Sequence, residues 1–296
     1  MVMRNRLIFF LAATGLALIV VSLSFDLALI RQPAETFNGP RAYQDVVTQV
    51  GFGPRTPGSE SHAQALTWMQ SELETAGWQV EIQAEVVEGH NLQNLVARRG
   101  ATSPQVILGA HYDSRLVADR DQGPARNAPV PGANDGASGV AILLELARTL
   151  PSDSVPVWMV FFDAEDNGGL PGWNWLLGSR AFVATLTNTP RAVVIVDMVG
   201  DADLNIYEEY NSTQALVEEI WEQAAALGYE RYFIPEGKYS MLDDHTPFLE
   251  AGIPTVDIID FNYPYYHTSA DTADKVSPQS LEVVGKTLWA WIVNQE

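Results

Sequence analysis

Val157-Trp-Met-Val-Phe-Phe-Asp-Ala-Glu-Asp166 begins with six consecutive apolar residues and ends with three carboxylates within four positions. A short, unbroken apolar run is typical of a strand buried on both faces of a parallel sheet. Three further segments are predicted strands: Val106–Leu108, Ala192–Val196 and Thr255–Ile259, of which the last is interrupted by Asp257. Because helical stretches separate these strands, the sequence predicts an α/β fold, a three-layer sandwich with a mostly parallel central sheet flanked by helices.

The segments between and after the strands carry the apolar periodicity of helices. We expect helices at residues 139–150, 178–186, 212–227, 246–251 and 277–293. Upstream, a short helix is predicted over 42–50, and a longer one follows the N-cap Ser59 as far as Ala76. Residues 80–86 alternate like a half-buried strand and 94–98 form its expected partner, so the sheet is predicted to be mixed.

The composition excludes several classes of protein. The formal net charge is -20, which would repel nucleic acid and an anionic bilayer surface. The 296 residues contain no cysteine, so there is no disulfide framework, thiol nucleophile or cysteine-based zinc site. Any metal must therefore be held by histidine and carboxylates. The length fits one large α/β domain with an N-terminal appendage.

An uncharged apolar run occupies Leu7 to Leu23 and is preceded by Arg4 and Arg6. This pattern is typical of a signal peptide or of a single membrane anchor, and because Ser22-Leu23-Ser24 is only a fair cleavage site, the anchor is favoured. We therefore expect residues 1–30 to be a signal anchor or signal peptide with a short tether, and residues 31–296 to be one catalytic domain. The domain would be extracytoplasmic, contacting the membrane through this segment only, or secreted after cleavage. The oligomeric state is left open.

Ionisable residues stand at the predicted carboxyl ends of the strands, where open α/β sheets bind their ligands. A catalytic zinc takes three nitrogen or oxygen ligands and keeps one position open. Asp135, Asp166 and His267 supply that number. Glu165 precedes one of them and points in another direction, which favours the role of general acid and base. The remaining candidates at these ends are His111, Asp113 and Asp197.

Six motifs together resemble the zinc aminopeptidase superfamily, which also contains the glutaminyl-peptide cyclotransferases. They are His111-Tyr-Asp-Ser114, Gly132-Ala-Asn-Asp-Gly-Ala-Ser-Gly139, Phe162-Asp-Ala-Glu-Asp166, Gly178-Ser-Arg180, Asp197-Met-Val-Gly200 and His267-Thr268. Other details are more similar to the bacterial cyclotransferases: the insertion at 115–131, Asp243-Asp-His-Thr-Pro-Phe248 and the segment 257–268. We therefore place the cyclotransferases ahead of the aminopeptidases.

This resemblance implies one zinc ion on the three ligands named above, with Glu165 moving the proton and with Asp197 and Asp243 supporting it. In the dinuclear aminopeptidases, the positions of His111 and Asp197 bind a second zinc that Asp135 bridges. His111 and Asp113 are thus either ligands of a second ion or hydrogen-bonding neighbours of the first. One zinc is expected in a cyclotransferase, and two are compatible with an aminopeptidase.

The implied activity is zinc-dependent conversion of an N-terminal glutamine of a peptide to pyroglutamate, with release of ammonia. The alternative is hydrolysis of N-terminal residues by a zinc aminopeptidase; both act on peptides or proteins with a free N-terminus. A binding domain that has lost catalysis is disfavoured, because every ligand is retained.

Two residues depart from the family pattern. Asp166 stands where glutamate is common, and Tyr266 stands where cyclotransferases commonly have tryptophan. We expect an apolar cup for the glutamine side chain, formed by the aromatic residues Trp173, Trp175, Phe261, Tyr265 and Tyr266. Asp244 and His245 are expected to cap the helix that begins near Thr246.

Overall fold

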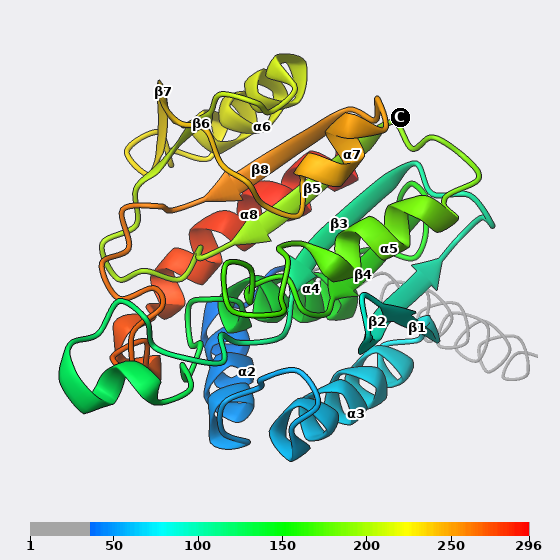
Figure 1. The fold of residues 1–296 in the computed structure, drawn as a ribbon. Coiled ribbons are helices and arrows are strands. Elements are labelled where there is room, and N and C mark those ends of the chain that lie inside the picture. Colours follow the sequence, from blue (N-terminus) through cyan, green and yellow to red (C-terminus); the bar gives the residue numbers. More distant parts are fainter. Residues whose placement is uncertain (1–35, 296) are drawn as a thin grey trace, which may run out of the picture. The chain divides into compact units, whose positions relative to one another are not determined.

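The computed structural model describes residues 36–295, and its centre is a six-stranded sheet in the order β1-β2-β4-β3-β5-β8 (Figure 1). Strands β4, β3, β5 and β8 are mutually parallel, whereas β1 and β2 form an antiparallel hairpin that joins at β4. The predicted mixed, mostly parallel sheet is therefore confirmed. The strand bounds are Gln79–Val87 for β1, His90–Arg99 for β2, Val106–His111 for β3, Val157–Phe162 for β4, Ala192–Asp197 for β5 and Thr255–Ile259 for β8.

Helices cover both faces of this sheet, because alternate residues of each strand point to opposite sides. Met159 and Phe161 of β4 belong to the large core under one helical layer, while Val160 and Phe162 belong to a smaller core on the other side. The large core takes apolar residues from α2 (Gly39–Gly51), α3 (Glu60–Thr75), α4 (Ala137–Thr149), α6 (Gln214–Ala226) and α8 (Pro278–Val293). The smaller core packs under α5 (Leu177–Thr185) and α7 (Thr246–Glu250). This arrangement is the predicted three-layer sandwich.

Local signals placed several helix ends correctly. The Ser59 hydroxyl accepts a hydrogen bond from the backbone N–H of His62 at 3.1 Å, so it caps α3 as predicted. The Ser277 hydroxyl caps α8 in the same way. Two parallel strands, β6 (Ile206–Glu209) and β7 (Phe233–Tyr239), were not predicted, and neither were two short 3₁₀ turns, η2 (Gly123–Asn127) and η3 (Ala273–Lys275).

Close packing between α4 and β5 depends on Gly139. A Cβ at this position would lie 2.2 Å from the carbonyl oxygen of Val196. We expect Gly139→Ala to destabilise the protein by roughly 1–3 kcal/mol through overpacking, measured as the free energy of unfolding in denaturant. The control is Gly51→Ala, because no atom lies within 4 Å of the added methyl group. Equal stability of the two variants would contradict this packing argument.

Within residues 36–295, no helix combines the length and the apolar character needed to cross a bilayer. The apolar run expected to act as anchor or signal, Leu7 to Leu23, lies outside the described residues.

Candidate metal centre and active site

Two groups of three potential metal ligands meet at the carboxyl ends of the parallel strands, and Asp135 belongs to both. The first group is Asp135, Asp166 and His267, and the second is His111, Asp135 and Asp197; within each group the ligand atoms lie within 4.8 Å of one another. His267 Nε2 lies 2.8 Å from Asp166 Oδ1 and 3.8 Å from Asp135 Oδ2. His111 Nε2 lies 3.2 Å from an oxygen of both Asp135 and Asp197. Residues that are far apart in the sequence thus converge as predicted.

The first group has the electrostatics of a cation site. Asp166 Oδ2 is buried and makes no hydrogen bond within the described part of the chain. A buried, unpaired carboxylate oxygen is costly unless a cation or a proton meets it. Burial, followed by the nearby charge of Asp135, raises the pKa of Asp166 to about 6. A divalent ion between these two carboxylates and His267 would satisfy the free oxygen, so the residues present fit such an ion.

Asp113 fixes the backbone that carries Glu165 and Asp166. Its two carboxylate oxygens accept hydrogen bonds from the N–H of Glu165 at 3.2 Å, the N–H of Asp166 at 3.4 Å and the side-chain amide of Asn167 at 3.1 Å. It also lies 3.3 Å from His111 Nδ1. Because its oxygens are occupied in this way, the structure places Asp113 as a hydrogen-bonding neighbour, outside both groups of ligands.

Asp135 is held by a residue that the sequence did not single out. The carboxylate of Asp271 accepts hydrogen bonds from the backbone N–H of Asn134 at 2.9 Å and of Asp135 at 3.2 Å. The hydroxyl of Tyr263 donates to the same carboxylate at 2.6 Å. On the other side, Gly136 passes so close to His111 that a Cβ would lie 2.5 Å from its ring. The absence of a side chain at Gly136 therefore allows this close approach to His111.

Glu165 lies next to the ligands in a cavity of about 290 Å³. Its side chain is buried, and burial raises its pKa well above the usual range, with Asp166 and Asp243 adding to the effect and His111 opposing it. Burial likewise raises the pKa of Asp243 to about 7. A raised pKa brings a carboxyl group closer to the range in which it can both accept and donate a proton, which suits acid–base catalysis. The cavity is lined by Asp135, Glu165, Asp166, Trp175, Asp197, Met198, Met241, Leu242, Asp243, Ile259, Phe261, Tyr266 and His267.

A sequence model described as Peptidase family M28 matches residues 94–292, which include both groups of ligands. The chain belongs to this family. Two solved structures are similar over nearly the whole chain. Glutaminyl cyclase of Tannerella forsythia is 34% identical, with a TM-score of 0.82, covering 88% of this chain and 100% of that one. A Zn-dependent exopeptidase from Parabacteroides distasonis is 30% identical, with a TM-score of 0.83, covering 89% of this chain and 100% of that one.

Among curated proteins, the glutaminyl-peptide cyclotransferase-like protein of Bos taurus is 26% identical over an alignment of 282 positions, which covers 79% of this chain and 70% of that protein. Together these matches confirm the predicted resemblance. Both a cyclase and an exopeptidase share the fold, so the choice of reaction depends on the site itself.

Aromatic rings form one wall of this M28 site. Trp175, Phe261 and Tyr266 line the cavity, as expected. The ring of Trp175 is stacked on that of His267, with centroids 6.2 Å apart. Trp173 is not among the described residues that line the cavity; its ring stacks on His90 at 3.6 Å instead. Tyr265 contacts Tyr263 and is likewise outside the lining.

The insertion at 115–131 supports the same wall from outside. The guanidinium of Arg115 lies 5.1 Å from the centroid of the Trp175 ring and donates to the carbonyl of Asp166 at 2.7 Å. It also pairs with Asp119, whose Oδ1 lies 3.7 Å from His267 Nδ1. The insertion thus positions both a candidate ligand and an aromatic wall, a role that sequence reasoning did not assign to Arg115 or Asp119.

The expected capping by Asp244 and His245 is wrong. His245 occupies the N-cap position of α7, but its side chain makes no capping hydrogen bond. Its ring is buried, with Nε2 3.5 Å from Glu209 and Nδ1 3.5 Å from Asp257. The carboxylate of Asp244 is fully buried as well. The ring of His245 thus lies between two buried carboxylates, and neither His245 nor Asp244 caps the helix.

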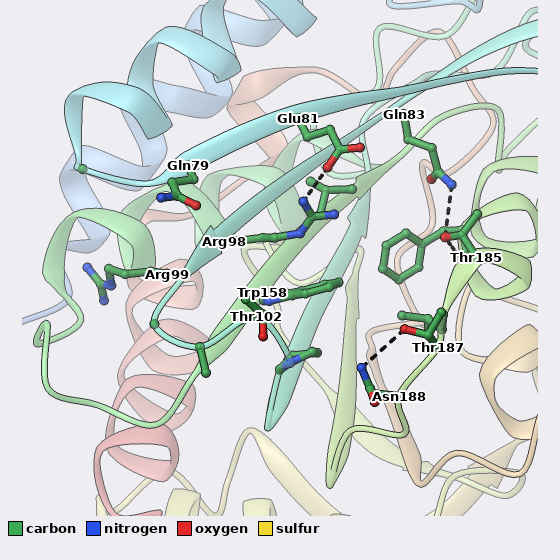
Figure 2. Close-up of a pocket in the computed structure, with 17 residues that line it drawn as sticks. Gln79, Glu81, Gln83, Arg98, Arg99, Thr102, Trp158, Thr185, Thr187 and Asn188 are labelled. Carbon is green, nitrogen blue, oxygen red and sulfur yellow. Dashed lines mark hydrogen bonds and ion pairs between the residues drawn. The ribbon is translucent and has the colours of Figure 1, made fainter.

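A second and larger cavity, of about 730 Å³, lies on the outer face of β1, β2 and β4 and is bordered by α5 (Figure 2). Its floor is Trp158, over which the Arg98 guanidinium stacks at 4.4 Å, and Arg98 also pairs with Glu81. Trp158 stands near the amino end of β4, whereas the candidate ligands follow the carboxyl ends. None of its lining residues belongs to either group of ligands.

Proposed function

We propose that this protein is a zinc-dependent glutaminyl-peptide cyclotransferase, which converts the N-terminal glutamine of peptides to pyroglutamate and releases ammonia. The observation that carries the proposal is the cavity of about 290 Å³ in which Glu165 and the candidate ligands lie beside a wall of three aromatic side chains. This volume lies near the lower end for small-molecule sites and suits one folded side chain. The similarity to the Tannerella forsythia glutaminyl cyclase supports the same reaction.

Asp135, Asp166 and His267 are the proposed ligands of one zinc ion. The grouping of their ligand atoms within 4.8 Å and the unpaired Asp166 oxygen support this assignment. When bound, zinc supplies a Lewis acid that polarises the γ-carboxamide of the substrate and stabilises the negative charge on its oxygen.

Glu165 is the proposed proton carrier. It accepts a proton from the α-amine as the nitrogen attacks the side-chain carbonyl carbon, and it later donates a proton to the departing ammonia. Its raised pKa, due mainly to burial, suits both directions of transfer. Asp197 and Asp243 line the same cavity and are proposed to support Glu165. The aromatic walls exclude water and hold the flexible glutamine in the folded pose from which the ring closes.

The second candidate function is that of a zinc aminopeptidase. The observation that favours it is the group of His111, Asp135 and Asp197, because it offers a second cation a place beside the first. The similarity to the Parabacteroides distasonis exopeptidase adds to it. In that case Glu165 would activate a water molecule and would not act on the amine.

Two chromogenic dipeptides, one with N-terminal glutamine and one with N-terminal leucine, separate these functions. We expect ammonia and a pyroglutamyl product from the first and no turnover of the second. Treatment with a chelator should stop the reaction, and added zinc should restore it. Release of free glutamine or leucine without ammonia would establish the aminopeptidase instead.

We also propose that the enzyme acts outside the cytoplasmic membrane, on the basis of the charged start and apolar run in residues 4–23. Fractionation of cells that express the full chain tests this location. Activity confined to the cytosol would contradict it.

A further inference from the structure

Aromatic side chains continue from the catalytic cavity towards the two-stranded β6–β7 sheet. Phe261 and Tyr266 line the cavity, with ring centroids 5.0 Å apart. Phe261 meets Tyr239 of β7 edge to face at 5.3 Å, and Tyr239 meets Tyr207 of β6 at 6.4 Å. We call these four residues the aromatic belt. Each is only partly buried, so the belt offers a continuous apolar surface that leads out of the cavity.

A lysine stands at the outer end of this belt. Lys238 Nζ lies 4.1 Å from the ring centroid of Tyr207 and 5.0 Å from that of Tyr239. Asn262 holds the arrangement, because its Oδ1 accepts hydrogen bonds from Lys238 Nζ at 2.9 Å and from the Tyr239 hydroxyl at 2.5 Å. Lys238 is exposed, and it forms no ion pair with a carboxylate of residues 36–295. The contact with Asn262 therefore fixes the position of the Lys238 charge, which remains available to a ligand.

The distance between cavity and lysine matches a short length of peptide. Lys238 Nζ lies 5.0 Å from the centroid of the Tyr239 ring, and that centroid lies 5.3 Å from the centroid of the Phe261 ring. Lys238 Nζ is therefore within about 10 Å of the Phe261 ring. An extended chain advances roughly 3.3–3.6 Å per residue, so three residues at most cover this distance. A glutamine in the cavity would thus place the next residues of its peptide along the belt.

The charge of a substrate peptide decides whether its contact with the belt strengthens binding. The protein carries a net charge of -20, and several carboxylates line its cavity. A carboxylate on the substrate peptide is therefore generally repelled. Lys238 opposes that repulsion at one point. Arg120, the other cation on the belt, lies over Tyr266 at the cavity end and donates to its backbone carbonyl, so a carboxylate farther out meets Lys238.

Building on the proposed function, we propose that the aromatic belt and Lys238 form the subsite for the residues that follow the N-terminal glutamine. In this subsite Lys238 selects a carboxylate of the peptide. That carboxylate comes from an acidic side chain two or three residues along the chain, or from the C-terminus of a short peptide.

Steady-state kinetics with matched peptides test this subsite. One series consists of Gln-Xaa-Xaa amides in which glutamate replaces glutamine at the second or third position, and a parallel series has a free C-terminal carboxylate. We expect the carboxylate to raise kcat/KM by roughly two- to five-fold in low salt, the scale of an exposed ion pair, mainly through KM. Salt should weaken the preference by screening.

Lys238→Gln should abolish this preference and Lys238→Glu should reverse it in favour of lysine-containing peptides. Lys286→Gln, which removes an equivalent charge from α8, should retain it. A preference among the amides identifies the acidic side chain as the source, whereas one confined to the free acids identifies the C-terminus. An unchanged preference in Lys238→Gln overturns the subsite while the cyclase stands. If no glutamine peptide is cyclised at all, the proposed function fails and the subsite fails with it.

Discussion

Glu165→Gln is expected to lower kcat for cyclisation by roughly 10²–10⁴-fold, the range that general acid–base catalysis contributes. Glutamine keeps the size of the side chain but cannot accept or return the proton. Because Glu165 stands beside the proposed ligands and is not one of them, zinc should remain bound. Ammonia release measures the rate, and metal analysis of the same protein measures the zinc.

The matched control is Glu222→Gln, which removes an exposed carboxylate from α6 and should leave kcat unchanged. Turnover by Glu165→Gln at the rate of the unmodified protein would remove Glu165 as the proton carrier. Loss of zinc together with activity would instead make it a ligand. The two measurements thus give separate answers on proton transfer and on metal binding.

His267→Ala should release the metal, because it removes one of three proposed ligands. We expect zinc affinity to fall by more than the roughly 10- to 100-fold that follows loss of an outer hydrogen-bonding partner. Titration with a competing chelator measures this change. His90→Ala is the control, because His90 stacks on Trp173 away from the cavity.

His111→Ala adds a second comparison. If one zinc ion is bound by Asp135, Asp166 and His267, removal of His111 should leave the zinc-to-protein ratio unchanged. A ratio that falls from two to one would show that the other group also holds an ion, which is the arrangement expected of the aminopeptidase. Full zinc affinity in His267→Ala would contradict the proposed ligand set.

The fold was largely predictable because its central strands are buried on both faces and therefore appear as mostly apolar runs. The strands β6 and β7 were missed for the opposite reason. Most of β7 is exposed, and it contains Pro235 and Gly237, so neither an apolar run nor an alternation marks it. Its pairing with β6 joins residues that are 27 to 30 positions apart, which no local pattern records.

The candidate ligands could be found from the sequence because each stands at a strand end or in a motif shared with the superfamily. The residues that hold them could not. Asp271 and Arg115 act through backbone groups brought close only by folding, and a lone charged residue in a loop has no distinctive neighbours. Only their positions in the sequence could have indicated these two residues: Asp271 follows His267 by four residues, and Arg115 is the first residue of the insertion.

Trp173 and Trp175 illustrate the limits of spacing. Only one residue separates them, yet one ring faces the cavity and the other packs on His90 at the hairpin. Composition predicts that such a segment supplies an aromatic wall. It does not predict which of the two rings does so.

Asp135 is common to both groups of ligands, and this has a consequence for how preparations of the protein should be compared. Its two oxygens face different histidines, so an ion bound by one group of ligands alters the charge felt by the other group. The measured rate will then depend on the free zinc concentration and not only on the amount of enzyme. A series of buffered zinc concentrations, spanning depletion to excess, is therefore the proper baseline for every variant.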